Sequence, residues 1–343
     1  MSRLLASLIL AILLVAVLVV GVGAYLPGVF RGQSAAQPPL AQTSIPIASA
    51  TSEPTALSAE PTNTPTVAPT ATTAATPTSA AASAKEAEYK AIVDRYLADL
   101  PGTFGVIVKD LKTGDTVMIN PDRPFPSASL FKLGLLYEVL LEAKAGKLSL
   151  KTLMDINEAH MAESEGDEKL VPGMSVTIDR SLWFLITLSS NSAAHALHEH
   201  VSWSDMNASM REAGFVNTRM NGDPNEPKYG DWRDQQGSTT SRDMLRFFEM
   251  VYNKNLLDEE SSEKMMYLLR NQQVDDRLSY NLPKGVVMAH KTGNLQGTIN
   301  DVGIIFGPKT DLYVGVISEG ADYEMTTQAL RGLGRALYDA ANS

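Results

Sequence analysis

The chain has 343 residues and a formal net charge of −10. This acidic balance excludes the basic face that binding to nucleic acid requires, so we expect no nucleic-acid partner. The chain contains no cysteine, which excludes disulfide bonds, thiolate metal sites and a cysteine nucleophile.

The chain begins with an apolar segment. Residues 4–26 carry no charged side chain, and a helix of this length crosses a hydrocarbon core of about 30 Å. A cleaved signal peptide would have a shorter apolar region, of about 7 to 15 residues, and a small-residue cleavage site. We therefore predict an uncleaved membrane anchor over residues 1–31, with a cytoplasmic N-terminus and the remainder of the chain on the extracytoplasmic side.

Residues 32–84 differ in composition from the anchor, because Thr, Pro, Ala and Ser dominate them. Such a segment has too little apolar surface to offset the entropy that it would lose on ordering. We predict a disordered linker, which would let a folded domain move above the membrane surface.

Residues 85–343 have the patterns of one folded domain. It opens with a helix predicted over residues 85–100 and has a long helical region in its middle. Strands are predicted at both of its ends, over residues 102–110, 115–120, 285–293, 298–307 and 311–320. Because strands of one sheet must meet in space, the pattern predicts an α/β (α+β) fold. We expect a mixed sheet flanked by helices, with an all-helical subdomain inserted between its strands.

A helix predicted over residues 130–145 contains a lysine, Lys132, three residues after Ser129. Side chains at this spacing lie one turn apart on the same face. The helix is apolar almost all round, which is typical of a buried helix. Burial lowers the pKa of a lysine toward values at which the neutral amine accepts a proton. We therefore predict that Lys132 activates Ser129 as a nucleophile.

The Ser-x-x-Lys spacing also occurs at Ser261 and Lys264, where the predicted helix is polar. Short motifs match by chance, and a solvated helix face is the simpler interpretation of this second pair. The apolar surroundings of Ser129 distinguish the first pair from the second.

Ser189 and Asn191 follow an apolar run that includes Trp183 and Phe184, which we interpret as core residues. Ser and Asn favour turns and helix starts over helix interiors. A loop between two helices could therefore direct the side chains of Ser189 and Asn191 at one point. A capped helix start is the alternative interpretation.

Lys291, Thr292 and Gly293 end a predicted strand. A cation and a hydroxyl beside a glycine suit an anionic, peptide-like ligand, because the missing Cβ allows close approach to the strand. A second Lys-Thr-Gly begins at Lys112. It lies in a predicted hairpin turn, where these residues are ordinary, and we interpret it as structural.

Ser-x-x-Lys, Ser-x-Asn and Lys-Thr-Gly, in this order, are the three elements of the penicillin-recognising serine enzymes. With them the sequence resembles the class A β-lactamases, and the resemblance covers nearly all of residues 86–343. It includes the stretches FPSASLFKLGLL, LVPGMSVTIDRSLWFLITLSSNSAAHAL and LLRNQQVDDRLSYNLPKGVVMAHKTGNLQGTINDVGIIF. The resemblance implies a serine hydrolase that forms an acyl-enzyme and needs no cofactor or metal.

The resemblance also implies a role for each matching residue. Ser129 would attack the carbonyl carbon, and Lys132 would share its proton. The backbone N–H groups of Ser129 and Asn294 would form the oxyanion hole. Ser189 would pass a proton to the leaving nitrogen. The substrate contacts would come from Asn191, which bonds a side-chain amide, and from Lys291, Thr292 and Gly293, of which the first two hold a carboxylate and help keep Lys132 neutral.

The sequence departs from the family pattern at two places. Ser190 replaces the usual aspartate between Ser189 and Asn191, and we expect this to be tolerated because that side chain does not contact substrate. The second departure is the loop that should carry the deacylating glutamate. Glu226, followed by proline, matches the family only with a short deletion, and Asp223, also followed by proline, is the competitor. We favour Glu226 as the residue that positions the deacylating water.

His195, His198 and His200 invite a metal interpretation, but their spacing matches no zinc-binding motif. We interpret them as surface histidines of a helix and predict no metal site.

Three functions compete. The first is hydrolysis of a β-lactam by a membrane-anchored monomer outside the cytoplasmic membrane. The alternatives are a D-Ala-D-Ala carboxypeptidase, or penicillin-binding protein, acting on cell-wall peptide, and a receptor or pseudoenzyme that stays acylated.

Overall fold

The computed structural model describes residues 83–161, 169–220 and 237–343. The predicted anchor and nearly all of the predicted linker lie outside these residues, so both stay predictions. Within the described ranges no helix has the length and apolar character needed to cross a membrane. All described residues belong to one unit of the chain, Thr76–Ser343.

The main sheet has five strands in the order β2-β1-β9-β8-β7, drawn from both ends of the domain as predicted. They are β1 (Thr103–Asp110), β2 (Thr116–Ile119), β7 (Met288–Leu295), β8 (Thr298–Ile305) and β9 (Leu312–Glu319). Every neighbouring pair in this sheet is antiparallel. The prediction of a mixed sheet is therefore wrong. The reason is that short loops join β1 to β2, β7 to β8 and β8 to β9, and parallel neighbours would need long crossovers instead.

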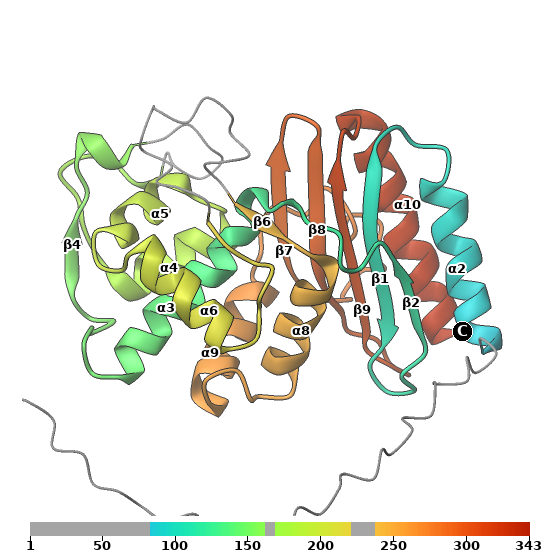
Figure 1. Cartoon of the computed structure of the whole chain (residues 1–343), viewed down its shortest axis with the longest axis horizontal. Helices are drawn as coiled ribbons and strands as arrows, with labels where there is room; N and C mark the ends of the chain where they lie inside the picture. Colours follow the sequence, from blue (N-terminus) through green and yellow to red (C-terminus); the bar gives the residue numbers. More distant parts are fainter. Residues whose placement is uncertain (1–82, 162–168, 221–236) are drawn as a thin grey trace, which may run out of the picture. The chain divides into compact units, whose positions relative to one another are not determined.

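Two helices cover one face of this sheet. They are α2 (Ala84–Leu97) and α10 (Tyr323–Asn342), which lie side by side on the sheet in Figure 1. Leu312, Val314 and Val316 of β9 face these helices, whereas Tyr313 and Ile317 belong to the core on the other face. This alternation is the period of two that a strand between two apolar layers requires.

The helical region lies beyond strand β7, the edge of the sheet (Figure 1). Its helices are α3 (Phe131–Lys144), α4 (Ile178–Thr187), α5 (Asn191–His198), α6 (Trp203–Glu212) and α9 (Glu259–Arg270), while α8 (Ser241–Tyr252) packs against β1 and β9. Asp or Ser/Thr side chains cap the start of five of these, with α3 the exception. Such caps satisfy N–H groups that the first turn leaves without a partner.

The helical region also contains strands, so the prediction of an all-helical subdomain is wrong. A two-stranded ribbon pairs β4 (Leu153–Asp155) with β5 (Ser175–Thr177). Met154 and Val176 oppose each other in its register, and both are buried. Strands of three residues are too short to show an alternating pattern in the sequence, which is why the sequence did not reveal them.

The Lys-Thr-Gly at residues 112–114 forms the hairpin turn between β1 and β2, as predicted. The Asp110 carboxylate accepts hydrogen bonds from the backbone N–H groups of Lys112 and Thr113, each at 2.9 Å. Gly114 has a φ of +85°, which a residue with a side chain rarely adopts. This copy of the motif is therefore structural.

Candidate active site

Ser129 lies in a 3-10 turn, η1 (Ala128–Leu130), that leads directly into helix α3. The short strand β3 (Phe125–Pro126), paired with β6 (Ser238–Thr239), delivers the chain to this turn. Ala128 has a φ of +45°, a left-handed conformation that costs a non-glycine residue about 1–3 kcal/mol. Such strain persists only where the surroundings hold it. It therefore marks the residue before the predicted nucleophile as a constrained position.

Lys132 lies one turn after Ser129 and is fully buried, as its apolar neighbours predicted. Its Nζ donates hydrogen bonds to the backbone carbonyl of Ser189 and to Oδ1 of Asn191, the latter at 2.7 Å. The Ser189 hydroxyl lies 3.4 Å from the same Nζ. The structure therefore brings the first two sequence motifs together.

Both interpretations of the Ser189 region hold. Ser189 and Ser190 lie between helices α4 and α5, and Ser189 has a left-handed φ of +56°. Ser190 is the N-cap of α5, because its hydroxyl accepts a hydrogen bond of 3.0 Å from the backbone N–H of Ala193. Aspartate and serine are both strong N-cap residues. The replacement of the family's aspartate by Ser190 therefore keeps a cap at this helix start.

Lys291 brings the third motif to the same place. Its Nζ donates to the Ser189 hydroxyl and to the Thr292 carbonyl, both at 2.8 Å, and its side chain is fully buried. Burial lowers the pKa of Lys291 well below its usual range, and the positive charges of Lys132 and Arg277 lower it further. Two amino groups thus meet at one serine. Because like charges repel, each disfavours the proton on the other.

Burial and the charge of Lys132 lower the pKa of Lys291. The lowered pKa that the sequence predicts for Lys132 itself stays a prediction. The two amines are better treated as a coupled pair that holds fewer protons than two isolated lysines would. The Ser189 hydroxyl, in reach of both, is the polar group through which a proton can pass between them.

Gly293 allows strand β7 to lie against the turn that carries Ser129. A Cβ atom built on Gly293 would stand 3.1 Å from the Ser127 carbonyl oxygen and 3.2 Å from the Ser129 backbone nitrogen. These contacts would be too tight for an ordinary side chain. Thr292 is buried beside this contact and Asn294 is exposed after it. The structure gives the missing Cβ a role other than the predicted approach of a ligand, because it brings the segments of Ser129 and Asn294 together. The predicted contact with a ligand stays a prediction.

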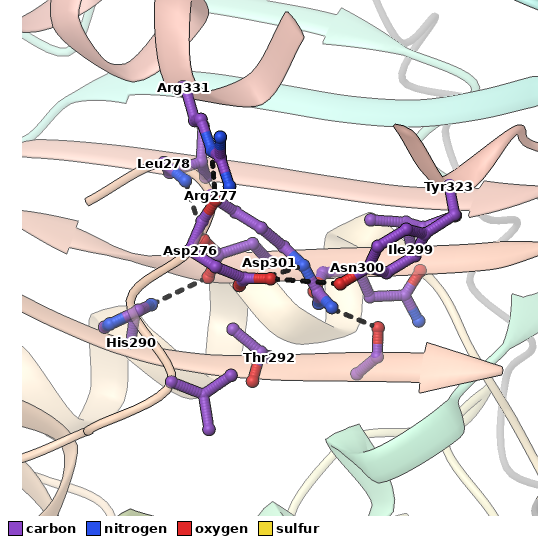
Figure 2. Close-up of polar contacts among 12 residues, drawn as sticks. Asp276, Arg277, Leu278, His290, Thr292, Ile299, Asn300, Asp301, Tyr323 and Arg331 are labelled. Carbon is purple, nitrogen blue, oxygen red and sulfur yellow. Dashed lines mark hydrogen bonds and ion pairs between the residues drawn. The ribbon is translucent and has the colours of Figure 1, made fainter. Parts of the chain in front are cut away.

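Arg277 is a buried residue of this region that sequence reasoning missed. One of its terminal nitrogens, Nη1, donates to the carbonyl of Gly293 at 3.1 Å and to that of Asn300 at 2.8 Å. Figure 2 shows Arg277 beside Asn300. The guanidinium therefore ties β7 to β8 at the end of the third motif. Its segment, DDRLSY, is polar and without periodicity, so the sequence gives no signal of burial.

His290 and Asp301 form a second buried polar pair beside this arginine, also visible in Figure 2. Their Nδ1 and Oδ1 atoms are 2.8 Å apart, and the other Asp301 oxygen accepts a 3.1 Å hydrogen bond from the Leu278 backbone. Buried polar groups are stable only when they are paired, which is the case here. This pair joins the segment after Arg277 to the strand that carries Lys291.

Comparison with known proteins agrees with this arrangement. Residues 86–341 match the model of the Beta-lactamase enzyme family. The chain belongs to the β-lactamase enzyme family. The resemblance inferred from the three motifs is thereby confirmed, and the fold that carries them is the mixed helix-and-sheet fold of that family with an antiparallel sheet.

Several relatives of known structure or name share this family. The extended-spectrum β-lactamase PER-1 of Pseudomonas aeruginosa is 28% identical over 278 residues, which cover 72% of this chain and 85% of PER-1. The β-lactamase CARB-4 of the same organism is 29% identical over 57% of this chain and 69% of its own length. The β-lactamase structure from Sphaerobacter thermophilus is 25% identical with a TM-score of 0.67, over 74% of this chain and 97% of that chain.

Two carboxylates compete for the predicted deacylating role. Glu226 and its competitor Asp223 both lie outside the described residues. The assignment of Glu226 therefore stays a prediction of the sequence.

His198 and the second Ser-x-x-Lys make contacts of their own. His198 stacks on Trp203 with ring centroids 4.2 Å apart, and its Nδ1 contacts the Val201 carbonyl. Among the residues that the structure describes, no group of His, Cys, Asp or Glu could hold a metal ion. Lys264 forms an ion pair with Asp179 at the surface. Of the two aromatic residues interpreted as core, Phe184 is buried and Trp183 is partly buried at the edge of the hydrophobic core.

Proposed function

We propose that this protein is a β-lactamase that opens the β-lactam amide through an acyl intermediate on Ser129. One observation carries the proposal. Lys132, one turn after Ser129, and Lys291 meet at Ser189 in a chain of the β-lactamase enzyme family. Acyl transfer needs a nucleophile, a proton acceptor and a proton donor to the leaving group in one place. These side chains supply all three.

In the proposed acylation, the Ser129 hydroxyl oxygen attacks the lactam carbonyl carbon and its proton passes to the amine of Lys132. The backbone N–H groups of Ser129 and Asn294 stabilise the negative charge that develops on the carbonyl oxygen. Ser189 delivers a proton to the lactam nitrogen as the carbon–nitrogen bond breaks. Lys291 and Thr292 bind the substrate carboxylate, and Asn191 binds its side-chain amide. The product is an ester on Ser129.

Deacylation determines whether the enzyme releases its product and can react with another substrate molecule. We propose that a carboxylate, Glu226 in preference to Asp223, positions a water molecule that attacks the ester. Without such a group the acyl-enzyme would persist, as in a penicillin-binding receptor.

We also propose that the catalytic domain works outside the cytoplasmic membrane, held by a single helix over residues 1–31 and a linker over residues 32–84. The uncharged run of residues 4–26 supports this arrangement. Protease treatment of intact spheroplasts should remove the domain and leave a short membrane-bound fragment. Recovery of the intact chain in the soluble fraction would contradict the proposal.

The purified protein should be mixed with a chromogenic cephalosporin while intact mass follows the acyl-enzyme. Continuous turnover supports a β-lactamase, whereas a persistent adduct supports an acylated receptor. Release of D-Ala from a peptide, without reaction with the cephalosporin, supports a carboxypeptidase. Ser129→Ala should abolish adduct and turnover, and Ser261→Ala, in the surface copy of the motif, is the matched control that should change neither.

The deacylating residue is tested separately. Glu226→Gln should slow deacylation and let the adduct accumulate, and Asp223→Asn should leave it fast. The opposite pattern would transfer the role to Asp223, and an unchanged rate in both variants would refute the assignment to this loop.

A further inference from the structure

Asn300 of strand β8 is a fully buried amide whose polar atoms all bind backbone groups. Its Nδ2 donates to the Pro126 carbonyl at 3.0 Å and to the Ser127 carbonyl at 3.2 Å. Its Oδ1 accepts a 2.9 Å hydrogen bond from the backbone N–H of Ser318. A reversed amide would point its oxygen at two carbonyl oxygens, so these partners fix its orientation.

The two carbonyl groups that Asn300 holds lie immediately before the nucleophile. Pro126 and Ser127 lead into Ala128, whose left-handed φ of +45° requires support from its surroundings. The direction of the Ser129 backbone N–H follows from the geometry of this turn. By holding the carbonyl groups of Pro126 and Ser127, Asn300 fixes the side of the proposed oxyanion hole that the η1 turn supplies.

The main chain of Asn300 is tied to the other side of that hole. Asn300 pairs with Gly293 in the β7–β8 register, and Nη1 of Arg277 donates to the carbonyls of both residues. Gly293 directly precedes Asn294, which supplies the second proposed donor. Asn300 therefore contacts the segments of both donors, one through its side chain and one through its main chain.

We propose that Asn300 is a positioning residue that sets the separation between the backbone N–H groups of Ser129 and Asn294. The inference rests on the proposed acyl-transfer function. The role requires two donors and one acceptor at a fixed distance from the strand, which an asparagine side chain supplies. Aspartate has the same shape but no donor, and alanine has neither donor nor acceptor.

The test compares Asn300→Ala with Ser318→Ala in the full-length protein. Ser318 is an equally buried neighbour on β9, whose hydroxyl makes two hydrogen bonds of 2.8 Å to the backbone of Ile299. Each variant loses buried side-chain bonds in the same part of the sheet, but Ser318→Ala leaves the contacts to Pro126 and Ser127 in place. A cephalosporin and a slowly released β-lactam serve as the acylating probes.

Asn300→Ala should lower the acylation rate constant by about 10- to 100-fold, part of the effect of losing an oxyanion donor. KM and the fraction of chains that can be acylated should change less than this rate constant. The ester carbonyl stretching band of the trapped acyl-enzyme should move to higher frequency, because its hydrogen bonds weaken. Ser318→Ala should leave the band and the acylation rate close to those of the parent protein.

Equal acylation rates and equal carbonyl bands in the two variants would overturn the positioning role. Parent protein that forms no adduct with either probe would overturn the proposed function, and with it this inference. Should Asn300→Ala fail to fold, Asn300→Asp replaces it, because aspartate keeps the shape but cannot donate to the Pro126 and Ser127 carbonyls. A carbonyl band in Asn300→Asp at the parent frequency would likewise overturn the proposal.

Discussion

Replacing Gly293 by alanine adds one methyl group where strand β7 lies against the turn that carries Ser129. The new carbon would stand 3.1 Å from the Ser127 carbonyl oxygen, 3.1 Å from the Ala128 Cβ and 3.2 Å from the Ser129 nitrogen. These atoms belong to the main chain or to a Cβ, so no side-chain rotation can relieve the contacts. The strand and the turn must therefore move apart.

The size of that movement sets the expected effect. Ordinary contacts are about 3.5–4.0 Å, so the segments must separate by about 0.3–0.5 Å or more. Catalytic groups need to be held within about 0.5 Å of their productive geometry. Since complete loss of one oxyanion donor costs about 10²–10³ in kcat, we expect Gly293→Ala to lower kcat/KM by about 10- to 100-fold. This corresponds to about 1.4–2.7 kcal/mol of transition-state stabilisation.

The assay is steady-state hydrolysis of a chromogenic cephalosporin together with thermal unfolding. Gly134→Ala is the matched control, because its added methyl would meet the flexible side chain of Met206, with the Sδ atom at 3.2 Å, inside helix α3. The control should retain activity within about threefold and should unfold at a similar or higher temperature, since alanine favours a helix by about 1 kcal/mol over glycine. Unchanged kcat/KM in Gly293→Ala would refute the close-approach argument.

Three further predictions concern charge and capping. Because the pKa of Lys291 is lowered, its charge is lost at lower pH than that of an ordinary lysine. KM for an anionic β-lactam should therefore rise with pH. Calorimetry in buffers of different ionisation enthalpy should show that the protein takes up protons when the β-lactam binds, and no uptake would contradict the argument. Burial raises the pKa of the Glu138 carboxyl above 4.5. The protonated carboxyl therefore contributes fully to stability below about pH 4, and this contribution is lost as the pH rises. Glu138→Gln should accordingly raise the unfolding temperature at pH 7 but not at pH 4, where an equal gain would refute the titration argument. Ser190→Ala removes the cap of α5 and should cost about 1 kcal/mol, or about 2–4 °C, with unchanged unfolding temperature as the contrary result.

The strands and the first helix of the domain could be predicted because their signals are local. Short β-rich runs on either side of the turn at residues 112–114 specify β1 and β2. The capping box of Ser83 and Glu86 marks the start of α2. The mixed sheet was a wrong prediction because the short loops between β1 and β2, β7 and β8, and β8 and β9 allow only antiparallel neighbours. The β4–β5 ribbon was missed because its strands have only three residues each.

The burial of Lys132 could be predicted from the apolar residues around it in the sequence. An apolar run around Lys132 can only mean burial, and a buried amine needs partners. The partners of Arg277, Asn300 and Glu138 could not be predicted, because each is buried by segments far away in the sequence. Glu138, for example, accepts a hydrogen bond from Ser209 of another helix. Its own helix carries three more charged residues, Lys132, Glu142 and Lys144, so the sequence does not single out Glu138 as the buried carboxylate.

The coupling between Lys132 and Lys291 gives the substrate a part in preparing the site. In the free protein, burial and the charge of Lys132 disfavour a proton on Lys291. A bound carboxylate supplies a negative charge next to Lys291 and so favours its protonation. A charged Lys291 in turn favours the neutral amine on Lys132, because the same repulsion acts in both directions, and the Ser189 hydroxyl lies within reach of both amines. In the proposed acylation, an anionic substrate that favours the proton on Lys291 would thereby favour the neutral Lys132 that accepts the proton of Ser129.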